Sequence, residues 1–302
     1  MSREFNLSRF KSCATVKALL KEAAVALSEA GVDTPALDAD LLMMHHLKVD
    51  RVGLFMASAD SLSPASLDGF LWLLERRMTR EPLAYITGST GFWDLELDVV
   101  PGVLVPRPDT ETLIESALAV LPSSQEKKCR MVDLGTGSGA IALSMASALP
   151  GHEIIATDRS EVALEAARKN ALKNGLEESV AFVRGVWFEA FSEEVGVFDV
   201  ILSNPPYIPS ADIDELEPEV AVHEPRLALD GDVDGLRDYR VIIEGCRKHL
   251  APGGWLLLEM GFDQRDAVRE ILDATGLFES IVHINDYAGN NRVVRARRVQ
   301  AS

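Results

Sequence analysis

The sequence predicts an α/β fold in which a mostly parallel sheet with helices on both faces follows a small helical bundle and a β-hairpin. From residue 130 onward, short apolar runs alternate with amphipathic stretches, as in sheets whose parallel strands are connected by helices. Residues 16–80 instead carry apolar side chains at helical spacing. The stretch between them mixes apolar residues with glycine and proline, which is typical of a hairpin. We therefore expect three parts, at residues 1–82, 83–105 and 106–302.

The first part is expected to be a bundle of three or four helices connected by short loops. Apolar spacing and flanking proline and glycine residues place these helices at residues 16–27, 35–47, 50–57 and 63–80. No reactive set of side chains is evident among them. We therefore expect this part to recognise a substrate, and the alternative is a purely structural role.

The third part is expected to contain a seven-stranded sheet. Strands are predicted at residues 131–134, 153–158, 180–183, 198–203, 255–259, 278–284 and 292–299. Helices are predicted at residues 110–121, 140–149, 160–173, 236–250 and 264–275. Asp109 or Thr110 is placed to cap the first of these helices, and Ala-Pro-Gly-Gly at residues 251–254 reads as a turn before a strand.

The composition is that of an ordinary globular protein, with 47% hydrophobic and 25% charged residues. No apolar run approaches the length of a membrane span, and residues 1–6 lack the pattern of a secretory signal. The 3 cysteines are scattered, which predicts neither a disulfide framework nor a metal site. His45 and His46 are adjacent on a predicted helix and therefore point in different directions. We expect a cytoplasmic monomer that binds no metal and no membrane.

The formal net charge is −17, and the acids are concentrated after residue 210. Residues 211–238 contain ten acidic residues, opposed within that stretch by Arg226 and Arg237 alone. Proteins that bind duplex nucleic acid usually neutralise phosphates with lysine and arginine, so this region favours a neutral or basic partner. A solvated acidic loop that helps solubility is the alternative.

The most informative stretch is Asn-Pro-Pro-Tyr at residues 204–207, directly after an apolar strand. The prolines end that strand because they have no N–H, and open α/β sheets bind ligands at such strand ends. The Asn204 amide oxygen and the Pro205 carbonyl are two acceptors, and Pro206 restricts the direction of the second. Beside the flat ring of Tyr207 they form a clamp suited to a planar NH2 group. A simple strand-ending turn is the alternative.

A second ligand-binding pattern is Gly-Thr-Gly-Ser-Gly at residues 135–139, between a strand and a helix. Glycine lets the backbone approach a ligand, but the spacing differs from the pattern that binds a pyrophosphate. Asp133 lies beside the turn, and Asp158 ends the next strand, where a carboxylate can accept hydrogen bonds from ribose hydroxyls. A ribose-bearing cofactor without pyrophosphate fits S-adenosylmethionine (SAM) better than NAD. Trp187 is a candidate for stacking on adenine, and a core position is the alternative.

These motifs together resemble the class I amino-methyltransferases, and others narrow the resemblance to the release factor glutamine methyltransferases, the PrmC/HemK family. The resemblance extends over essentially the whole chain. Its further motifs are Pro-Arg-Pro-Asp-Thr-Glu at residues 106–111, Trp187-Phe188, Glu224-Pro225, Ala228-Leu229, Asp-Gly-Leu at 234–236, Asp-Tyr-Ala-Gly-Asn at 286–290, and Arg292.

The resemblance implies a Rossmann-like methyltransferase domain that transfers a methyl group from SAM and releases S-adenosyl-L-homocysteine. It implies that the acceptor is N5 of the glutamine in the Gly-Gly-Gln motif of class 1 peptide chain release factors. The implied cofactor contacts are Gly135, Thr136, Gly137, Ser138, Gly139, Asp158, Trp187 and Asn204. The implied catalytic residues are Asn204, Pro205 and Tyr207, and the implied glutamine site is Asn204, Pro205, Pro206 and Tyr207.

Two positions depart from the family pattern. Gly185 stands where family members often carry an acid, which puts the adenine contacts there in question. His223 stands where an aromatic residue is common, which puts the packing of that loop in question. Neither position belongs to the clamp.

Other classes of function remain as alternatives. A nucleic-acid amino-methyltransferase acting on adenine N6 or guanine N2 shares the Asn-Pro-Pro-Tyr motif, but the acidic stretch disfavours it. A non-catalytic SAM-binding scaffold would have no use for an intact clamp. A dehydrogenase is disfavoured by the glycine spacing.

Overall fold

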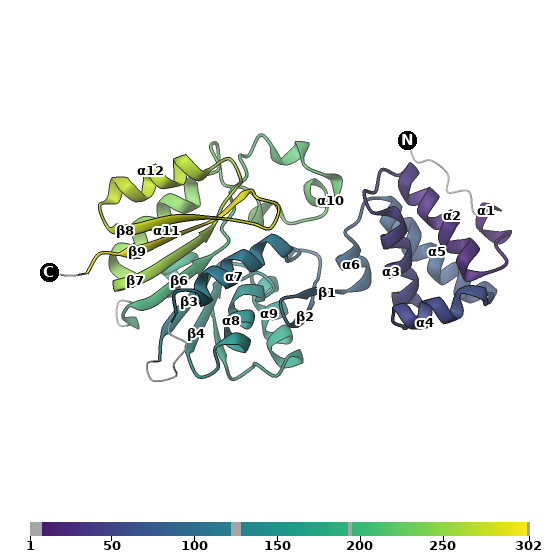
Figure 1. The fold of residues 1–302 in the computed structure, drawn as a ribbon, viewed down its shortest axis with the longest axis horizontal. Coiled ribbons are helices and arrows are strands. Elements are labelled where there is room, and N and C mark those ends of the chain that lie inside the picture. Colours follow the sequence, from purple (N-terminus) through teal and green to yellow (C-terminus); the bar gives the residue numbers. More distant parts are fainter. Residues whose placement is uncertain (1–7, 122–127, 193–194, 301–302) are drawn as a thin grey trace. The chain divides into compact units, whose positions relative to one another are not determined.

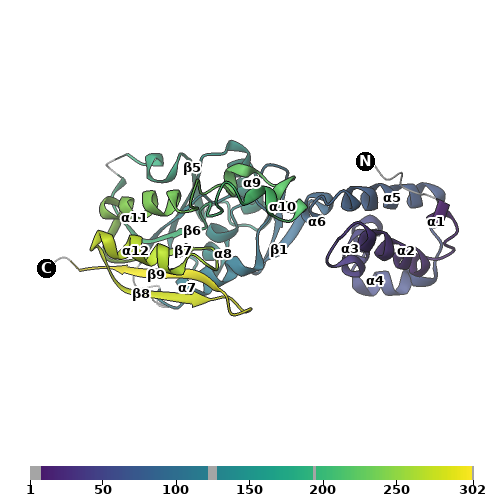
Figure 2. The same ribbon diagram turned by 90° about the horizontal axis from the view of Figure 1, so that it is seen from above.

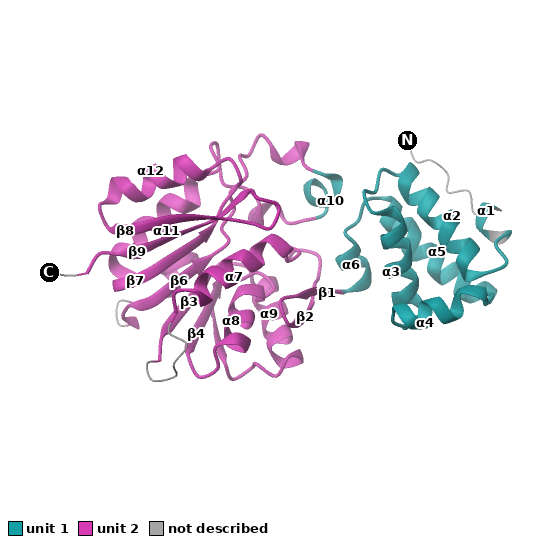
Figure 3. Cartoon of the chain, viewed as in Figure 1, with its two compact units in different colours: residues 1–88, 217–223 teal, residues 89–216, 224–302 magenta. Residues whose placement is uncertain are grey.

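The computed structural model describes residues 8–121, 128–192 and 195–300. The chain divides into two compact units, residues 1–88 with 217–223 and residues 89–216 with 224–302 (Figure 3). Among the described residues, no helix is both long and apolar enough to cross a membrane. The stretch 1–6, for which the sequence predicts no secretory signal, lies outside the described residues, so this expectation stays a prediction.

Unit 1 is built from helices. They are α1 Ser8–Lys11, α2 Val16–Glu29, α3 Pro35–Leu47, α4 Arg51–Met56, the 3-10 turn η1 Ala57–Ala59, α5 Pro64–Met78, α6 Leu83–Thr87 and α10 Pro218–Ala221. Side-chain oxygens of Thr15, Asp50 and Ser63 cap α2, α4 and α5 by accepting backbone N–H groups. The apolar faces meet in a core that includes Leu27 and Phe70, both fully buried.

Residues 83–88 differ from the expected hairpin strand, because they form helix α6. Pro82 occupies the N-cap position, and Gly88 ends the helix in a left-handed conformation with φ of 83°. Tyr85 and Ile86 are buried and adjacent, which fits a short helix and not an alternating strand. The hairpin itself is shorter and consists of β1 Ser89–Phe92 and β2 Leu95–Asp98.

Unit 2 contains a seven-stranded sheet in the order β5-β4-β3-β6-β7-β9-β8 (Figures 1 and 2). Its strands are β3 Arg130–Leu134, β4 Glu153–Asp158, β5 Val180–Arg184, β6 Phe198–Ser203, β7 Leu250–Glu259, β8 Phe278–Asn285 and β9 Asn291–Arg298. The pairs from β5 through β7 are parallel, and β9 is antiparallel to both β7 and β8. This sheet confirms the predicted mostly parallel α/β fold.

Helices cover both faces of this sheet. They are α7 Glu111–Leu118, α8 Ala140–Ala148, α9 Glu161–Lys173, α11 Arg237–His249 and α12 Arg265–Thr275, with 3-10 turns η2 Pro108–Thr110, η3 Trp187–Ala190, η5 Ile213–Glu215 and η6 Arg226–Ala228. Helices α7 and α8 pack on one face, against Met131 and Leu202 among others. Helices α11 and α12 pack on the other, against Val132 and Ile201. Successive residues of a strand therefore point into the cores on opposite faces of the sheet. Because both faces are buried, the parallel strands are apolar along nearly their whole length.

The predicted turn at residues 251–254 belongs to β7, which begins at Leu250. The pairing of β7 with β6 shifts register between Phe198 and Val200. A register shift of this kind accommodates the proline and glycines inside a strand, because the irregular residues need not form ladder hydrogen bonds. The sequence pattern alone reads the same residues as a turn.

Candidate functional site

A cavity of about 510 Å³ lies in unit 2, where the strand order reverses between β3 and β6. β4 pairs with one edge of β3 and β6 with the other, so the connections after β3 and β6 diverge at this point. Open α/β sheets bind ligands in the crevice that this divergence leaves at the carboxyl ends of the strands. The cavity lining includes predicted residues from the connections after β3 and β6 and from the ends of β4 and β5: Gly135, Thr136, Gly137, Ser138, Asp158, Trp187, Asn204 and Pro206.

The Gly-rich turn reaches the cavity because its three glycines adopt left-handed backbone conformations. Gly135, Gly137 and Gly139 have φ of 77°, 58° and 87°, values that side chains disfavour. Gly139 is the N-cap of α8 and does not line the cavity. At the glycines the turn therefore presents backbone to a ligand, and Thr136 and Ser138 line the cavity between them.

Asp133 stabilises the Gly-rich turn through hydrogen bonds. Its Oδ2 accepts the Thr136 hydroxyl at 2.6 Å and the Ala142 N–H at 3.2 Å, and its side chain is fully buried. Oδ1 has no partner among the described residues. Burial raises the pKa of Asp133 to about 7, against hydrogen bonds from Thr136 and Ala142 that lower it. Asp133 thus shapes the turn, and it does not itself line the cavity.

Asp158 lies at the end of β4, on the opposite side of the turn. Its Oδ2 accepts the Gly137 N–H at 2.9 Å and its Oδ1 accepts the Ser160 N–H at 2.8 Å. Each carboxylate oxygen keeps a second lone pair for a ligand hydroxyl. Burial raises the pKa of Asp158, and the backbone hydrogen bonds partly offset this effect.

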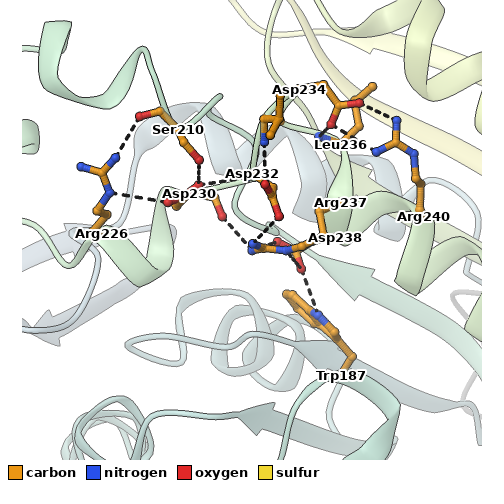
Figure 4. Close-up of polar contacts among 12 residues, drawn as sticks. Trp187, Ser210, Arg226, Asp230, Asp232, Asp234, Leu236, Arg237, Asp238 and Arg240 are labelled. Atoms are coloured by element: carbon orange, nitrogen blue, oxygen red, sulfur yellow. Dashed lines mark hydrogen bonds and ion pairs between the residues drawn. The ribbon is translucent and has the colours of Figure 1, made fainter.

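Trp187 begins the 3-10 turn η3 in a left-handed conformation with φ of 47°, which is unusual for a large side chain. Its indole Nε1 donates to Asp238 Oδ1 at 3.2 Å (Figure 4). Its ring lies against Gly135, where an added Cβ would approach the ring to 3.1 Å. The ring therefore lines the cavity and also packs on the core. Stacking of the Trp187 ring on adenine stays a prediction.

Gly185, one of the two departures from the family pattern, lines the cavity directly before this turn. A Cβ at this position would meet the Ala190 Cα at 2.5 Å. Any side chain here, including an acid, requires η3 to move. The glycine at position 185 therefore fits the close approach of η3, whereas an acidic side chain would not fit there.

His223, the other departure, belongs to unit 1. Its Nε2 lies 3.4 Å from the carbonyl oxygen of Thr79. This exposed contact is the hydrogen bond that the structure gives for the His223 side chain.

Asn204 lies at the carboxyl end of β6 and lines the cavity. Its Nδ2 donates to the Thr110 hydroxyl at 3.3 Å. No described residue hydrogen-bonds its Oδ1, which therefore remains available as an acceptor. The Thr110 hydroxyl makes no helix-capping hydrogen bond, contrary to one expectation from the sequence, because it is used by Asn204.

Pro206 lines the cavity, whereas Pro205 and Tyr207 do not. Tyr207 is held at both ends. Its carbonyl oxygen accepts Gln264 Nε2 at 2.8 Å, and its hydroxyl lies 3.5 Å from Glu259 Oε1. Burial raises the pKa of Tyr207 far above its ordinary value, so the phenol stays neutral.

Glu259 ends β7 beside the clamp and is almost completely buried. Burial raises its pKa to about 7, while the nearby Thr110 hydroxyl and the charge of Arg292 lower it. The sequence interpretation did not single out Glu259, Thr110 or the cavity-lining Arg107. Two features of the sequence could have identified these residues. Arg107 and Thr110 lie in the motif at residues 106–111, and Glu259 stands at the end of an apolar strand, as Asp158 does.

The acidic stretch carries much less uncompensated charge than its sequence implies, because most of its carboxylates are paired with arginines. Figure 4 shows Asp230, Asp232, Asp234 and Asp238 with the arginines beside them. Besides Arg226 and Arg237, the acids pair with Arg240 and with three arginines that are distant in sequence. The pairs are Asp214–Arg226, Glu217–Arg80, Glu219–Arg77, Glu219–Arg80, Glu224–Arg107, Asp230–Arg226, Asp232–Arg237, Asp234–Arg240 and Asp238–Arg237. Within residues 211–238 Arg226 and Arg237 are the only arginine or lysine residues, as the sequence shows, and the further partners come from outside that stretch. The argument that charge excludes nucleic acid is weaker than it appeared from the sequence.

The histidines and cysteines form no metal-binding group of three or more with acids among the described residues. His46 Nε2 lies 2.9 Å from the Ser66 hydroxyl, and its ring meets Phe70 edge-on.

Comparison with known proteins extends these observations. Residues 18–88 match the family model of the PrmC N-terminal domain, and residues 110–223 match that of the methyltransferase small domain. Release factor glutamine methyltransferase from Geobacter sulfurreducens is 40% identical over 271 residues, covering 90% of this chain and 92% of that protein. The protein of the same name from Salmonella typhimurium is 41% identical over 265 residues, covering 88% and 93%.

A solved structure supports the fold alone. A human methyltransferase 10 domain-containing protein has a TM-score of 0.51 at 19% identity, covering 70% of this chain and 90% of that one. The bacterial relatives, in contrast, share about two residues in five with this chain over nearly all of its length, as the 40% identity over 90% shows. The chain belongs to the release factor glutamine methyltransferase family.

Proposed function

We propose that this chain transfers the methyl group of SAM to the side-chain amide nitrogen, N5, of the glutamine in the Gly-Gly-Gln motif of class 1 peptide chain release factors. The observation that carries this proposal is the position of Asn204. It follows β6 directly and offers a free amide acceptor in the same cavity as the Gly-rich turn. A cofactor on the turn and an NH2 group on Asn204 would therefore be neighbours.

The cavity fits SAM in size and in chemistry. A volume of about 510 Å³ lies within the range of ordinary small-molecule sites. The turn at residues 135–139 exposes backbone to the methionine part, Asp158 offers acceptors to the ribose, and Trp187 offers an aromatic face to the adenine. When bound, SAM supplies an activated methyl group and leaves as S-adenosyl-L-homocysteine, while the amide nitrogen loses one proton to solvent.

The residues of the chain act mainly by orientation. An amide nitrogen is a weak nucleophile because its lone pair is delocalised into the carbonyl. Asn204 Oδ1 and the Pro205 carbonyl would accept its two hydrogens, which orients the NH2 and raises the electron density on nitrogen. Pro206 and Tyr207 would confine the side chain of the substrate. Correct placement of the two reacting atoms then supplies most of the rate.

The names of the relatives support a release factor as the protein substrate. We infer that the helical part recognises that partner, that the enzyme works in the cytoplasm where release factors act, and that it works as a monomer.

The test is a transfer assay with labelled SAM. The acceptors are a release factor, the same factor with its Gly-Gly-Gln glutamine changed to alanine, and unmethylated DNA and RNA. We expect label on the intact factor alone. Label on nucleic acid would favour adenine or guanine amino-methylation, and cofactor binding without transfer to any acceptor would favour a non-catalytic role.

A further inference from the structure

Helix α11 forms part of the cavity wall, and the proposed function assigns it no task. Asp238, Val241 and Gly245 all line the cavity, and their spacing places them on one face of the helix. Trp187 lies beside this face, because its indole Nε1 donates to Asp238 Oδ1 at 3.2 Å (Figure 4). The part of the cavity that we assign to adenine therefore has a second wall, and that wall carries a carboxylate.

Tight packing fixes α11 against the turn η3, which carries Trp187. A Cβ at Gly245 would collide with the ring of Phe188, the residue after Trp187. The Phe188 ring also stacks on His249 at the end of α11, with ring centroids 4.6 Å apart and an interplanar angle of 3°. The placement of the Trp187 indole beside Asp238 is therefore supported by two further contacts between the same elements.

The Asp238 carboxylate has one acceptor position to spare. Arg237 donates to both of its oxygens, from Nε to Oδ1 at 3.3 Å and from Nη2 to Oδ2 at 2.8 Å. Trp187 Nε1 occupies the second position on Oδ1. A carboxylate offers about four acceptor positions, so the fourth, on Oδ2, has no donor among the described residues. The side chain is 6% exposed, and an unsatisfied acceptor is costly at such burial, so a donor on a ligand in the cavity would be favourable there.

Arg237 is held in place by the loop that precedes α11. Its Nη2 also donates to the Asp230 carbonyl oxygen at 2.8 Å, and its Nη1 pairs with Asp232 Oδ2 at 3.4 Å (Figure 4). A guanidinium group is planar and rigid, so these contacts fix the direction of its two hydrogen bonds to Asp238. The protein, and not the ligand, therefore determines which acceptor position of Asp238 stays open.

The exocyclic amine of adenine is a hydrogen-bond donor that matches this open position. Two other acids line the cavity, Asp158 and Glu189. Asp158 lies beside the Gly-rich turn, where we expect the ribose, and Glu189 is exposed, so water competes for its oxygens. We propose that Asp238 determines the base specificity of the cofactor site by accepting the N6 amine of adenine at Oδ2, and that Arg237 positions its carboxylate. This inference rests on the proposed function, which makes SAM the cofactor.

The first consequence is that the site rejects a base with oxygen at position 6. In hypoxanthine a carbonyl oxygen replaces the amine, so two acceptors would face each other at Oδ2. A site that hydrogen-bonds a donor of its ligand discriminates strongly against analogues that lack the donor, because its own buried group is then left unpaired. We expect S-adenosyl-L-homocysteine to bind at least about tenfold more tightly than its hypoxanthine analogue, as measured by calorimetry.

The second consequence concerns Asp238→Asn, which changes the open position from an acceptor to a donor. N–H groups of Trp187 and Arg237 meet at the position of Oδ1, so the amide oxygen belongs there and the NH2 replaces Oδ2. A donor at this position favours the oxygen of hypoxanthine, and the preference for adenine should fall at least about tenfold. Both ligands are compared on the same variant, so a general loss of stability cancels in the ratio of the two dissociation constants. A purely structural role of Asp238 would weaken both ligands equally.

Asp234→Asn is the matched control. Asp234 also pairs with an arginine, Arg240 at 2.6 Å, but it does not line the cavity. The change removes the same charge from the same region and should leave the ratio unaltered. Glu189→Gln tests the other acid near the turn η3, and we expect it to keep the preference for adenine. Loss of the preference in Glu189→Gln and not in Asp238→Asn would overturn the proposal.

The binding measurements are independent of the methyl acceptor. Equal affinities of the wild type for the two ligands, or an unchanged preference in Asp238→Asn, would overturn the proposed contact with the base. Transfer to a release factor together with equal affinities would contradict the base contact alone. The expected base preference without transfer to any acceptor would contradict the proposed reaction alone.

Discussion

Asn204 is the residue on which the proposed chemistry depends most directly. Replacing it with alanine removes the acceptor that orients the substrate NH2, while the Gly-rich turn and Asp158 remain intact. We expect Asn204→Ala to lower kcat by about 10²-fold or more, because orientation accounts for much of the rate. The dissociation constant for SAM, measured by calorimetry, should change much less. A variant with near-normal turnover would exclude Asn204 as the amide acceptor.

Gly185 offers a test of how tightly the cavity wall is packed. Gly185→Ala adds a single Cβ, which would lie 2.5 Å from the Ala190 Cα and so displace η3 together with Trp187. Overpacking of this kind typically costs about 1–3 kcal/mol. We expect a lower Tm and weaker SAM binding. Gly91→Ala is the control, because an added Cβ there meets nothing within 4 Å. Equal effects of the two changes would contradict the argument.

At the scale of residues, the sequence identified the side chains at the ends of strands. It did not identify the side chains that hydrogen-bond them. Asn204 and Asp158 were recognised because strand ends are readable from apolar runs and turn residues. Thr110 looked like a helix cap, since a threonine before a helix usually is one. Its partner Asn204 is 94 residues away, and a single sequence carries no record of such a contact.

The best test at the scale of elements lies in unit 1, where Arg77 of α5 joins segments distant in sequence. Its Nε binds Asp38 of α3 at 2.7 Å, and its Nη1 binds Glu219 of α10 at 2.8 Å. The Arg77 and Asp38 side chains are 7% and 6% exposed. Breaking such a buried pair leaves a charge without its partner, which is far more costly than losing a surface pair.

We therefore expect Arg77→Met to destabilise unit 1 by about 3 kcal/mol, at the lower end of the usual range because Thr34 still bonds Asp38 and Arg80 still bonds Glu219. Hydrogen exchange should accelerate in α3, α5 and α10 and stay unchanged in the sheet. Arg247→Ala, which breaks an exposed pair with Glu244, is the control and should change stability by less than about 0.5 kcal/mol. Uniform acceleration across both units would contradict a local role.

Elements were predictable where one pattern dominated. The helix at 35–47 and the strand before the Gly-rich turn follow from spacing and punctuation alone. Two elements were not. Residues 83–87 form a helix because two adjacent buried side chains suit one, and residues 250–254 extend β7 because a register shift admits the proline. Both outcomes depend on packing partners that the sequence does not identify.

At the scale of the whole molecule, the charge of −17 conceals a network of pairs. The sequence shows how many acids there are, but not that distant arginines such as Arg107 neutralise them. Composition therefore describes the net electrostatic field of the protein, which governs solubility and association. It does not describe the local charge balance at the site. Exclusion of nucleic acid as a substrate rests on the transfer assay and not on charge.

The dependence of overall stability on pH follows from buried carboxyls in unit 2. Burial raises the pKa of Asp133 from 3.8 and that of Glu259 from 4.5, both to about 7. Between these values the folded state binds more protons than the unfolded state, so the free energy of unfolding falls as the pH rises. Burial lowers the pKa of His46, His249 and His283, which contributes the opposite slope below about pH 6.5.

The difference in Tm between a variant and the wild type isolates one carboxyl, because the histidines are common to both proteins. Glu259→Gln should resemble the wild type near pH 5, where Glu259 is largely protonated, and should become relatively more stable toward about pH 8, where the wild type must bury a charge. Asp133→Asn should show the same trend. Thr112→Val, a buried change without charge, should give a difference that is independent of pH. A constant difference for Glu259→Gln would mean that Glu259 ionises in the folded protein as readily as in the unfolded chain.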